Sequence, residues 1–398
     1  MSSFGELTAL RVEQTGPSGG EEFVYVDISS IDNQAKRIVD PKRLSPEAAP
    51  SRARQRLRKG DVLVSMTRPN LNAVAIVPPD LDGAIGSTGF HVLRANDDVE
   101  PHWLYYAVQS SSFVKSMCDL VQGALYPAVR PKDIREYAIS PPPLAKQREI
   151  VAELEKQFSR LDEAVANLQR VKANLKRYRA SVLNDAVEGR LVECDSPVEL
   201  VKLGSVANLI DPQPSHRTPP THPDGVPYIG IGDVLENGKL DFQNSRKVSP
   251  TVLEEHRARY TLSVGDFIFG KIGTLGRPTL LTPPFAYTLS ANVVLVQADG
   301  VRLLPEYALI FMDSPKLLNM ISRDAKATTQ AAYGIKRMRD LEINIPDIEQ
   351  QRKIVAEVDR HLSIIREVET EVDANLQRAQ SLRQSMLAKA FSVGVANG

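Results

Sequence analysis

The chain has 398 residues, of which 42% are hydrophobic and 25% charged, and its 49 basic residues balance its 49 acidic ones. This length exceeds one ordinary core and fits two to three domains. The neutral balance excludes a protein coated in positive charge, but it leaves room for a local basic patch. No run of 18 apolar residues occurs, Met1–Leu10 lacks a signal-peptide layout, and the cysteines are Cys118 and Cys194 alone. We therefore expect no membrane span, no disulfide framework and a cytoplasmic location.

Short β-like runs, broken by Gly, Pro and Asn, dominate the first 141 residues. Residues 23–28, 61–65 and 90–93 are rich in β-branched and aromatic side chains, which predicts strands. Pro101 suits a first helical turn, and the apolar spacing after it predicts one helix from Pro101 to about Leu120.

One long helix is predicted for residues 143–190. Apolar residues recur from Ile150 to Val182 in steps of three and four, and neither Pro nor Gly interrupts the segment from Leu144 to Glu188. Such a helix is roughly 65 Å long at 1.5 Å per residue. Gly189 suits its end.

Residues 191–345 repeat the first segment in outline. The runs 226–231 and 265–269 match the first unit's strands, and Pro305 matches Pro101. Six prolines in the 17 residues from Asp211 to Pro227 exclude a helix and predict an extended surface loop. A second long helix is predicted from about residue 347 to residue 391.

The closest repeat opens the two long helices. The sequence PPLAKQREIV at 142–151 returns as PDIEQQRKIV at 346–355, so that Gln147 matches Gln351. Each helix carries one apolar seam, which is unstable when exposed to water. We therefore expect the helices to pack on each other, and a parallel pair would hide the seams as well as an antiparallel one.

This arrangement resembles the specificity subunit (HsdS) of type I restriction-modification systems, in which a Pro-Pro-Leu-x-x-Gln-Arg-x-Ile-Val type signature opens each long helix. The second copy departs at Asp347 and Ile348, which suit a first helical turn. The resemblance covers essentially the whole chain. It implies an α/β (α+β) fold with two globular target recognition domains in tandem, each followed by a long helix, the helices forming an antiparallel coiled coil with pseudo-twofold symmetry. The implied domains are 1–142 (target recognition domain 1), 143–190 (spacer helix 1), 191–345 (target recognition domain 2) and 346–398 (spacer helix 2).

The resemblance also implies a function. Each target recognition domain would read one half of a bipartite, asymmetric site in double-stranded DNA, and the paired helices would set the spacing. The subunit would assemble with two modification (methyltransferase) subunits and with restriction (helicase-nuclease) subunits. It would direct adenine-N6 methylation or restriction, while S-adenosylmethionine, ATP and magnesium would bind to those other subunits.

The chain itself carries no recognisable catalytic motif. Its Pro-Pro pairs never form the Asn/Asp-Pro-Pro-aromatic loop of an adenine methyltransferase, and Gly270-Lys271 continues with Ile272, unlike a phosphate-binding loop. The six histidines are scattered without metal-ligand spacing. We therefore expect neither catalysis nor a metal site on this chain. A coiled-coil scaffold that binds only proteins remains an alternative, and a free-standing enzyme is disfavoured.

Two pairs of segments are predicted to touch DNA. Arginine suits guanine, asparagine or glutamine suits adenine, and basic or hydroxyl side chains suit phosphates. Loop 66–72 and its counterpart 271–277 carry different residues at matching positions, as readers of two half-sites would; the alternative is an ordinary polar hairpin loop. The stretches 122–132 and 328–339, before the long helices, place basic residues beside a tyrosine; the alternative is a solvated turn with the tyrosine in the core. The predicted contacts are Thr67, Arg68, Asn70, Asn72, Gln122, Tyr126, Arg130, Lys132, Lys271, Thr274, Arg277, Gln330, Tyr333, Lys336, Arg337 and Arg339.

Three further features are weaker. The proline-rich loop adds Arg217 as a predicted contact, although the loop could serve only as a linker. Asp133 and Asp340 are expected to cap or brace the turns before the helices. Five basic residues between Arg170 and Arg179 favour a solvated helix face over a contact with spacer DNA or a methyltransferase subunit.

Overall fold

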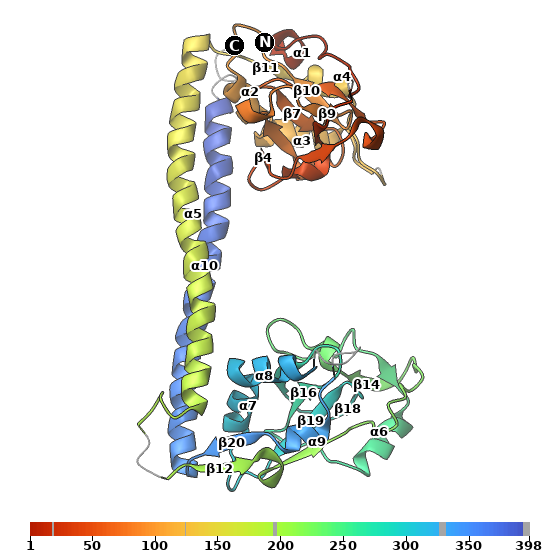
Figure 1. Ribbon diagram of the computed structural model, residues 1–398, viewed down its shortest axis with the longest axis vertical. Helices are drawn as coiled ribbons and strands as arrows, with labels where there is room; N and C mark the ends of the chain where they lie inside the picture. The colour runs from red at the N-terminus through yellow and green to blue at the C-terminus, as the bar shows by residue number, and fades with distance from the viewer. Residues whose placement is uncertain (18–19, 124, 194–196, 326–331, 393–398) are drawn as a thin grey trace. The chain divides into compact units, whose positions relative to one another are not determined.

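The computed structural model divides into two compact units (Figure 1). The described residues are 1–17, 20–123, 125–193, 197–325 and 332–392. Unit 1 comprises residues 1–169 and 373–398, and unit 2 comprises residues 170–372. The long helices α5 (Leu144–Val187) and α10 (Ile348–Ser392) therefore each contribute one half to each unit. Within the described segments, no helix has both the length and the apolar character that crossing a bilayer needs.

Unit 1 is built on two sheets. One has the strand order β10-β7-β8, and the other has the order β5-β2-β9-β6, in which only β2 and β9 run parallel. All four residues of the central strand β7 are buried, in keeping with its run of three apolar residues, Val62–Val64. The strands are β1 (Ser2–Ser3), β2 (Phe23–Val26), β3 (Ile31–Asp32), β4 (Arg37–Ile38), β5 (Lys42–Leu44), β6 (Ala53–Arg56), β7 (Val62–Ser65), β8 (Val74–Ile76), β9 (Ile85–Ser87), β10 (Phe90–Leu93) and β11 (Ala138–Ile139).

The helix predicted from Pro101 to Leu120 is two helices. These are α2 (Pro101–Ala107) and α3 (Ser111–Asp119). The hydroxyl of Ser110 accepts a hydrogen bond from the backbone N–H of Phe113, so that it caps α3 and ends the first helix. The single-helix prediction was therefore wrong. The remaining short helices of unit 1 are α1 (Phe4–Leu7) and α4 (Pro131–Arg135).

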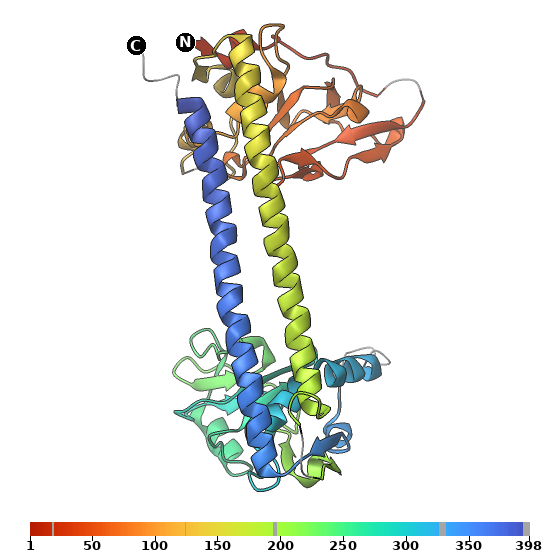
Figure 2. The ribbon, with the colours of Figure 1, turned by 90° about the vertical axis from the view of Figure 1, so that its left-hand side faces the viewer.

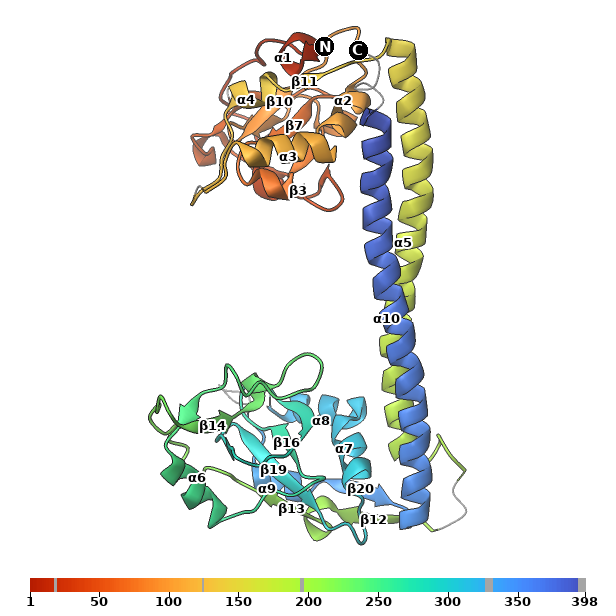
Figure 3. The same ribbon diagram turned by 180° about the vertical axis from the view of Figure 1, so that it is seen from behind.

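Unit 2 repeats this plan. Its central strand β16 is fully buried between β19 and β17, and β14 pairs in parallel with β18, as β2 does with β9. Figure 3 shows α7 and α8 beside the β16–β19 sheet. The strands are β12 (Glu199–Lys202), β13 (Ala207–Ile210), β14 (Val226–Ile229), β15 (Lys247–Val248), β16 (Phe267–Gly270), β17 (Gly276–Leu280), β18 (Thr288–Leu289), β19 (Val293–Ala298) and β20 (Glu342–Ile345), and the helices are α6 (Pro250–Arg257), α7 (Pro305–Asp313), α8 (Pro315–Ala325) and α9 (Ile335–Arg339).

The two long helices run antiparallel in each unit. In unit 1 the end of α10 lies beside the start of α5 (Figure 2), and both contribute to one core. Farther along, Arg383 lies 2.8 Å from Asp162 and stacks over Phe158. In unit 2 the hydroxyl of Tyr178 on α5 lies 2.6 Å from the Nδ1 atom of His361 on α10. The expected helix pairing is thus confirmed, and its direction is antiparallel.

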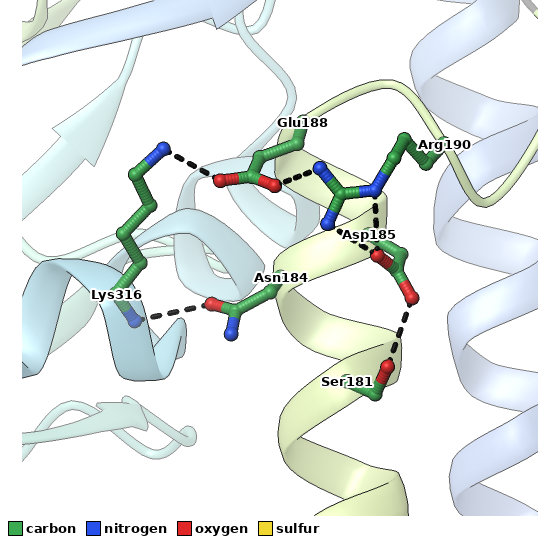
Figure 4. Close-up of polar contacts among 6 residues, drawn as sticks. All are labelled: Ser181, Asn184, Asp185, Glu188, Arg190 and Lys316. Atoms are coloured by element: carbon green, nitrogen blue, oxygen red, sulfur yellow. Dashed lines mark hydrogen bonds and ion pairs between the residues drawn. The ribbon is translucent and has the colours of Figure 1, made fainter.

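Polar contacts fasten the end of α5 to the globular part of unit 2. The side chain of Asn184 accepts a hydrogen bond of 3.1 Å from the backbone N–H of Lys316 in the first turn of α8 (Figure 4). The Lys316 ammonium lies 2.5 Å from Glu188, whose carboxylate also pairs with Arg190. These partners lower the pKa of Glu188. Arg190 in turn binds Asp185, so the chain is held where Gly189 ends the helix with φ +71°.

The repeated glutamine of the signature is an anchor between each long helix and its globular part. Gln147 is buried, accepts the N–H of Glu100 and donates to the carbonyls of Asp98 and Pro142. Glu100 immediately precedes α2, so Gln147 joins α5 to the start of α2. Gln351 makes the same three hydrogen bonds in unit 2, with Leu304, Arg302 and Pro346.

Candidate nucleic-acid interface

Two of the segments predicted from sequence lie side by side in unit 1. Thr67 forms a β-bridge with Ala128, and the N–H of Arg68 donates to the carbonyl of Pro127 at 2.8 Å. The N–H of Val129 donates in turn to the carbonyl of Met66 at 2.8 Å. Loop 66–72 and the stretch before α4 therefore form one continuous surface at the end of strand β7.

Unit 2 repeats this pairing. Ile272 forms a β-bridge with Ala332, and the N–H of Tyr333 donates to the carbonyl of Lys271 at 2.9 Å. Tyr333 therefore takes the place of Val129. The structure brings the two predicted segments together in both units.

The two loops share left-handed residues at two matching positions but carry different side chains. Arg68 (φ +51°) and Asn72 (φ +45°) are left-handed in the first loop, and Gly273 (φ +76°) and Arg277 (φ +55°) are left-handed in the second. Such a conformation is strained for residues other than glycine and is common at functional sites. The same scaffold thus presents two different sets of hydrogen-bonding groups.

The loop surface of unit 1 is hollowed. A cleft of about 400 Å³ is lined by Asn33, Thr67, Arg68, Leu71 and Tyr126, among others. Thr67, Arg68, Asn70 and Tyr126 are exposed, whereas Asn72 is half-buried. The Arg68 guanidinium has no hydrogen-bond or ion-pair partner among the described residues, so its donors are available to a ligand.

A lysine that sequence reasoning missed holds this loop in place. The Lys36 ammonium donates to the carbonyl of Asn72 at 2.6 Å, and the Lys36 carbonyl accepts from the Tyr105 hydroxyl at 2.8 Å. Burial, followed by the charge of Arg383, lowers the pKa of Lys36 to about 8. Lys36 and Asn33 lie in the β3–β4 hairpin, where no pattern in the sequence connects them with loop 66–72.

The predicted basic residues at the start of α4 are at the surface. Arg130 and Lys132 are exposed and pair with Asp133 and Glu136, and Gln122 is exposed in the preceding turn. The carboxylate of Asp133 accepts from the N–H of Arg130 at 2.7 Å, which confirms its capping role. Arg130 lowers the pKa of Asp133.

Two predicted contacts in unit 2 need correction because their side chains are buried. Tyr333 is 4% exposed and packs in the core. Lys271 is 3% exposed, and its ammonium lies 2.6 Å from Asp211. The two β-bridges make Tyr333 the counterpart of Val129, three residues beyond the place that would match Tyr126. Asp340 consequently is not the counterpart of Asp133; it follows α9 and braces the turn by pairing with Lys202 at 2.8 Å.

The other predicted contacts in unit 2 lie at its surface, and some of them brace the backbone. The guanidinium of Arg277 donates to the carbonyls of Val234 and Leu235, and that of Arg339 donates to the carbonyl of Leu209. Thr274, Lys336 and Arg337 are exposed. Gln330 lies outside the described residues.

The proline-rich loop forms no helix, as expected, but turns at 214–215 and 223–224 interrupt its predicted extended course. It is tied to the core at two points. One tie is the Asp211–Lys271 pair. At the other, the buried side chain of His256 hydrogen-bonds Gln213, whose amide donates to the carbonyl of Arg217 at 3.0 Å. Burial, followed by the charge of Arg259, lowers the pKa of His256. The exposed Arg217 therefore lies on a loop that these two contacts fix to the core.

The basic cluster on α5 includes a structural contact. Arg179 lies 2.7 Å from Asp313 at the end of α7, and Arg177 contacts Asn174 at 3.5 Å. Arg179 thus joins the helix to the globular part of unit 2. The remaining basic residues of the cluster lie on a largely exposed face, as expected.

Comparison with known proteins gives one consistent result. The family model described as "Type I restriction modification DNA specificity domain" matches residues 19–176 and 195–378. The EcoKI specificity subunit of Escherichia coli K12 is 27% identical over 312 residues, which cover 75% of this chain and 67% of that protein. The EcoBI specificity subunit of Escherichia coli is 24% identical over 270 residues, which cover 63% of this chain and 56% of that protein.

Two solved structures share the fold. A chain from a study of complex assembly and conformational transition of the type I R-M system is 28% identical, with a TM-score of 0.80 and coverage of 98% of this chain and 96% of that one. The HsdS subunit from Thermoanaerobacter tengcongensis is 27% identical, with a TM-score of 0.58 and coverage of 98% and 95%.

Proposed function

Because the chain belongs to the family of type I restriction modification DNA specificity domains, we propose that it is the DNA sequence-recognition subunit of a type I restriction-modification complex. The observation that carries this proposal is the duplicated loop surface at Arg68 and Arg277. The two surfaces share left-handed backbone positions and differ in side chains. They suit two different half-sites of one bipartite, asymmetric DNA site.

The chain's own part in this function is recognition, without catalysis. Modification subunits would transfer a methyl group from S-adenosylmethionine to adenine N6, and restriction subunits would use ATP and magnesium to cleave unmodified DNA. The paired helices α5 and α10 would set the spacer between the half-sites. Base-edge contacts would come from the loops, and phosphate contacts from the basic residues at the start of α4 and within α9.

Replacing Arg68 with alanine is expected to weaken binding of the specific site by about 1–3 kcal/mol, if its paired donors read a guanine. The loss should be confined to the half-site read by unit 1, because the loops of unit 2 are unchanged. Competition binding of the assembled complex, using duplexes mutated in one half-site at a time, measures this effect.

A matched control is Arg58→Ala, since Arg58 is exposed at the opposite end of strand β7. This variant should bind like the unaltered protein. Equal weakening on every duplex would instead assign Arg68 to a phosphate. Unchanged binding and modification after removal of Arg68, Arg130, Arg277 and Arg337 would favour the scaffold that binds only proteins.

An exposed stripe on each long helix supports the binding of two modification subunits. Five residues at helical spacing lie on one face of α5, and their five counterparts lie on one face of α10. Four of these matched positions carry the same residue in both helices, and the fifth carries an acidic residue in both. All ten side chains are exposed within their own unit, so helix packing does not require their identity. The buried seam is less alike, with Phe158 matching Leu362. The stripe residues are Arg148, Ala152, Glu155, Ser159 and Glu163 on α5, and Arg352, Ala356, Asp359, Ser363 and Glu367 on α10.

Placing arginine in the middle of one stripe should remove one modification subunit. Ser159→Arg is expected to give complexes with a single modification subunit, and the double variant with Ser363→Arg none, because a bulky charge would hold an interface apart. Native mass spectrometry of the co-expressed complex counts the subunits. Gln380→Arg, at an exposed position of α10 turned about 100° around the helix axis from Ser363, is the control. Two subunits retained by the double variant would place that interface elsewhere.

A further inference from the structure

Unit 1 exposes two large apolar side chains next to each other. Leu125 is 88% exposed and Tyr126 is 83% exposed. Among the described residues, Tyr126 is the most exposed aromatic side chain. Contiguous exposed apolar surface is typical of interaction sites, and these two neighbouring side chains form a small surface of that kind.

The segment that carries them is held away from the body of the unit. Behind Tyr126, the carbonyl of Pro127 accepts the N–H of Arg68, and Ala128 bridges Thr67. Ahead of Leu125, Gly123 turns the chain with φ +81°. Figure 3 shows the segment before α4 extending away from the sheet. Because its base is pinned, the pair cannot bury itself by a small shift of the chain.

The surroundings favour DNA as the covering molecule. Tyr126 shares its cleft with Thr67 and Arg68, and the exposed Arg130 and Lys132 follow it. Asp133 and Glu136 neutralise part of this charge, but Arg68 is unpaired among the described residues. Donors that suit phosphates and base edges therefore surround an apolar tip, and they include a lysine, a residue type that is depleted in protein–protein interfaces.

We propose that Leu125 and Tyr126 form a wedge that enters the DNA beside the half-site read by unit 1 and unstacks one base step. Leucine fills the gap between bases, and the tyrosine ring stacks on the base that is uncovered. Unstacking one step lowers the free energy needed to flip a nearby base out of the duplex. A partner subunit that methylates adenine requires such a flipped base. This inference rests on the proposed function and adds DNA distortion to base reading.

The test uses the assembled complex and duplexes with 2-aminopurine placed at successive positions in and beside each half-site. The unaltered complex should raise the fluorescence at one step near the half-site of unit 1. The variant Leu125→Ala/Tyr126→Ala should lose that signal and bind roughly 10–100-fold more weakly. A mismatch at the same step should restore much of its binding, because the step is already unstacked. Val301→Ala, at a 76% exposed residue of unit 2, should leave the signal unchanged.

The outcomes separate the two proposals. Specific binding by the unaltered complex without any fluorescence change overturns the wedge but leaves the proposed function standing. Absence of specific binding by the unaltered complex overturns the proposed function and the wedge with it. A double variant that keeps the signal but loses modification subunits in native mass spectrometry assigns the pair to a protein contact and overturns the wedge.

Discussion

Replacing Gln351 with alanine is expected to lower the free energy of unfolding by about 2–4 kcal/mol, although the change removes only a small polar side chain. The loss leaves the N–H of Leu304 and the carbonyls of Arg302 and Pro346 without their shared partner in a buried site. A buried group without its hydrogen bond retains the full penalty of its desolvation. Gln147→Ala should act in the same way in unit 1.

The matched control is Gln377→Ala, at an exposed position of α10, which should leave the urea transition almost unchanged. Hydrogen exchange across residues 304–308 should speed up in Gln351→Ala, since these residues form the first turn of α7. For Gln147→Ala, the fluorescence of Trp103, the single tryptophan of the chain, follows the start of α2. If Gln351→Ala or Gln147→Ala lowers the free energy of unfolding no more than Gln377→Ala does, the substituted glutamine is not an anchor.

The internal repeat made the architecture predictable from one sequence. Periodic apolar residues predicted α5 and α10, and the two copies of the signature matched the two globular parts to each other. The role of Gln147 was hidden, because its partners at Asp98 and Glu100 lie far away in sequence. The helix break at Ser110 could not be predicted either, because the apolar spacing of the sequence continues across the residue whose hydroxyl caps α3.

The position of the loops after a strand could be predicted from the sequence. Which of their side chains are buried and which are exposed could not. Lys271 and Arg68 both follow buried strands, and both are basic. One meets a carboxylate inside the unit and the other has an open cleft beside it, a difference set by Asp211, 60 residues away. Tyr126 and Tyr333 likewise are the same residue type, but Tyr126 is exposed and Tyr333 is buried. The residue type shows that a side chain can donate hydrogen bonds, whereas the fold decides whether that side chain is buried or exposed.

Replacing Lys271 with methionine is expected to destabilise unit 2 by about 2–4 kcal/mol, since it leaves the Asp211 carboxylate without its charge partner in a mostly buried site. The same change should loosen the start of the proline-rich loop. Binding to the half-site read by unit 2 should then weaken even at temperatures where the variant is folded, because Arg217 lies six residues after Asp211 on that loop.

A second substitution separates charge from packing. If the unpaired carboxylate causes the loss, Asp211→Asn in the Lys271→Met background should recover a large part of the stability, because a neutral amide is less costly to bury. If the methionine packs poorly, Asp211→Asn will recover nothing. Lys202→Met, which breaks the well-exposed pair with Asp340, is the control and should scarcely move the urea transition. Full recovery of stability without recovery of half-site binding would mean that the ion pair itself, and not merely a neutral contact, sets the loop that carries Arg217.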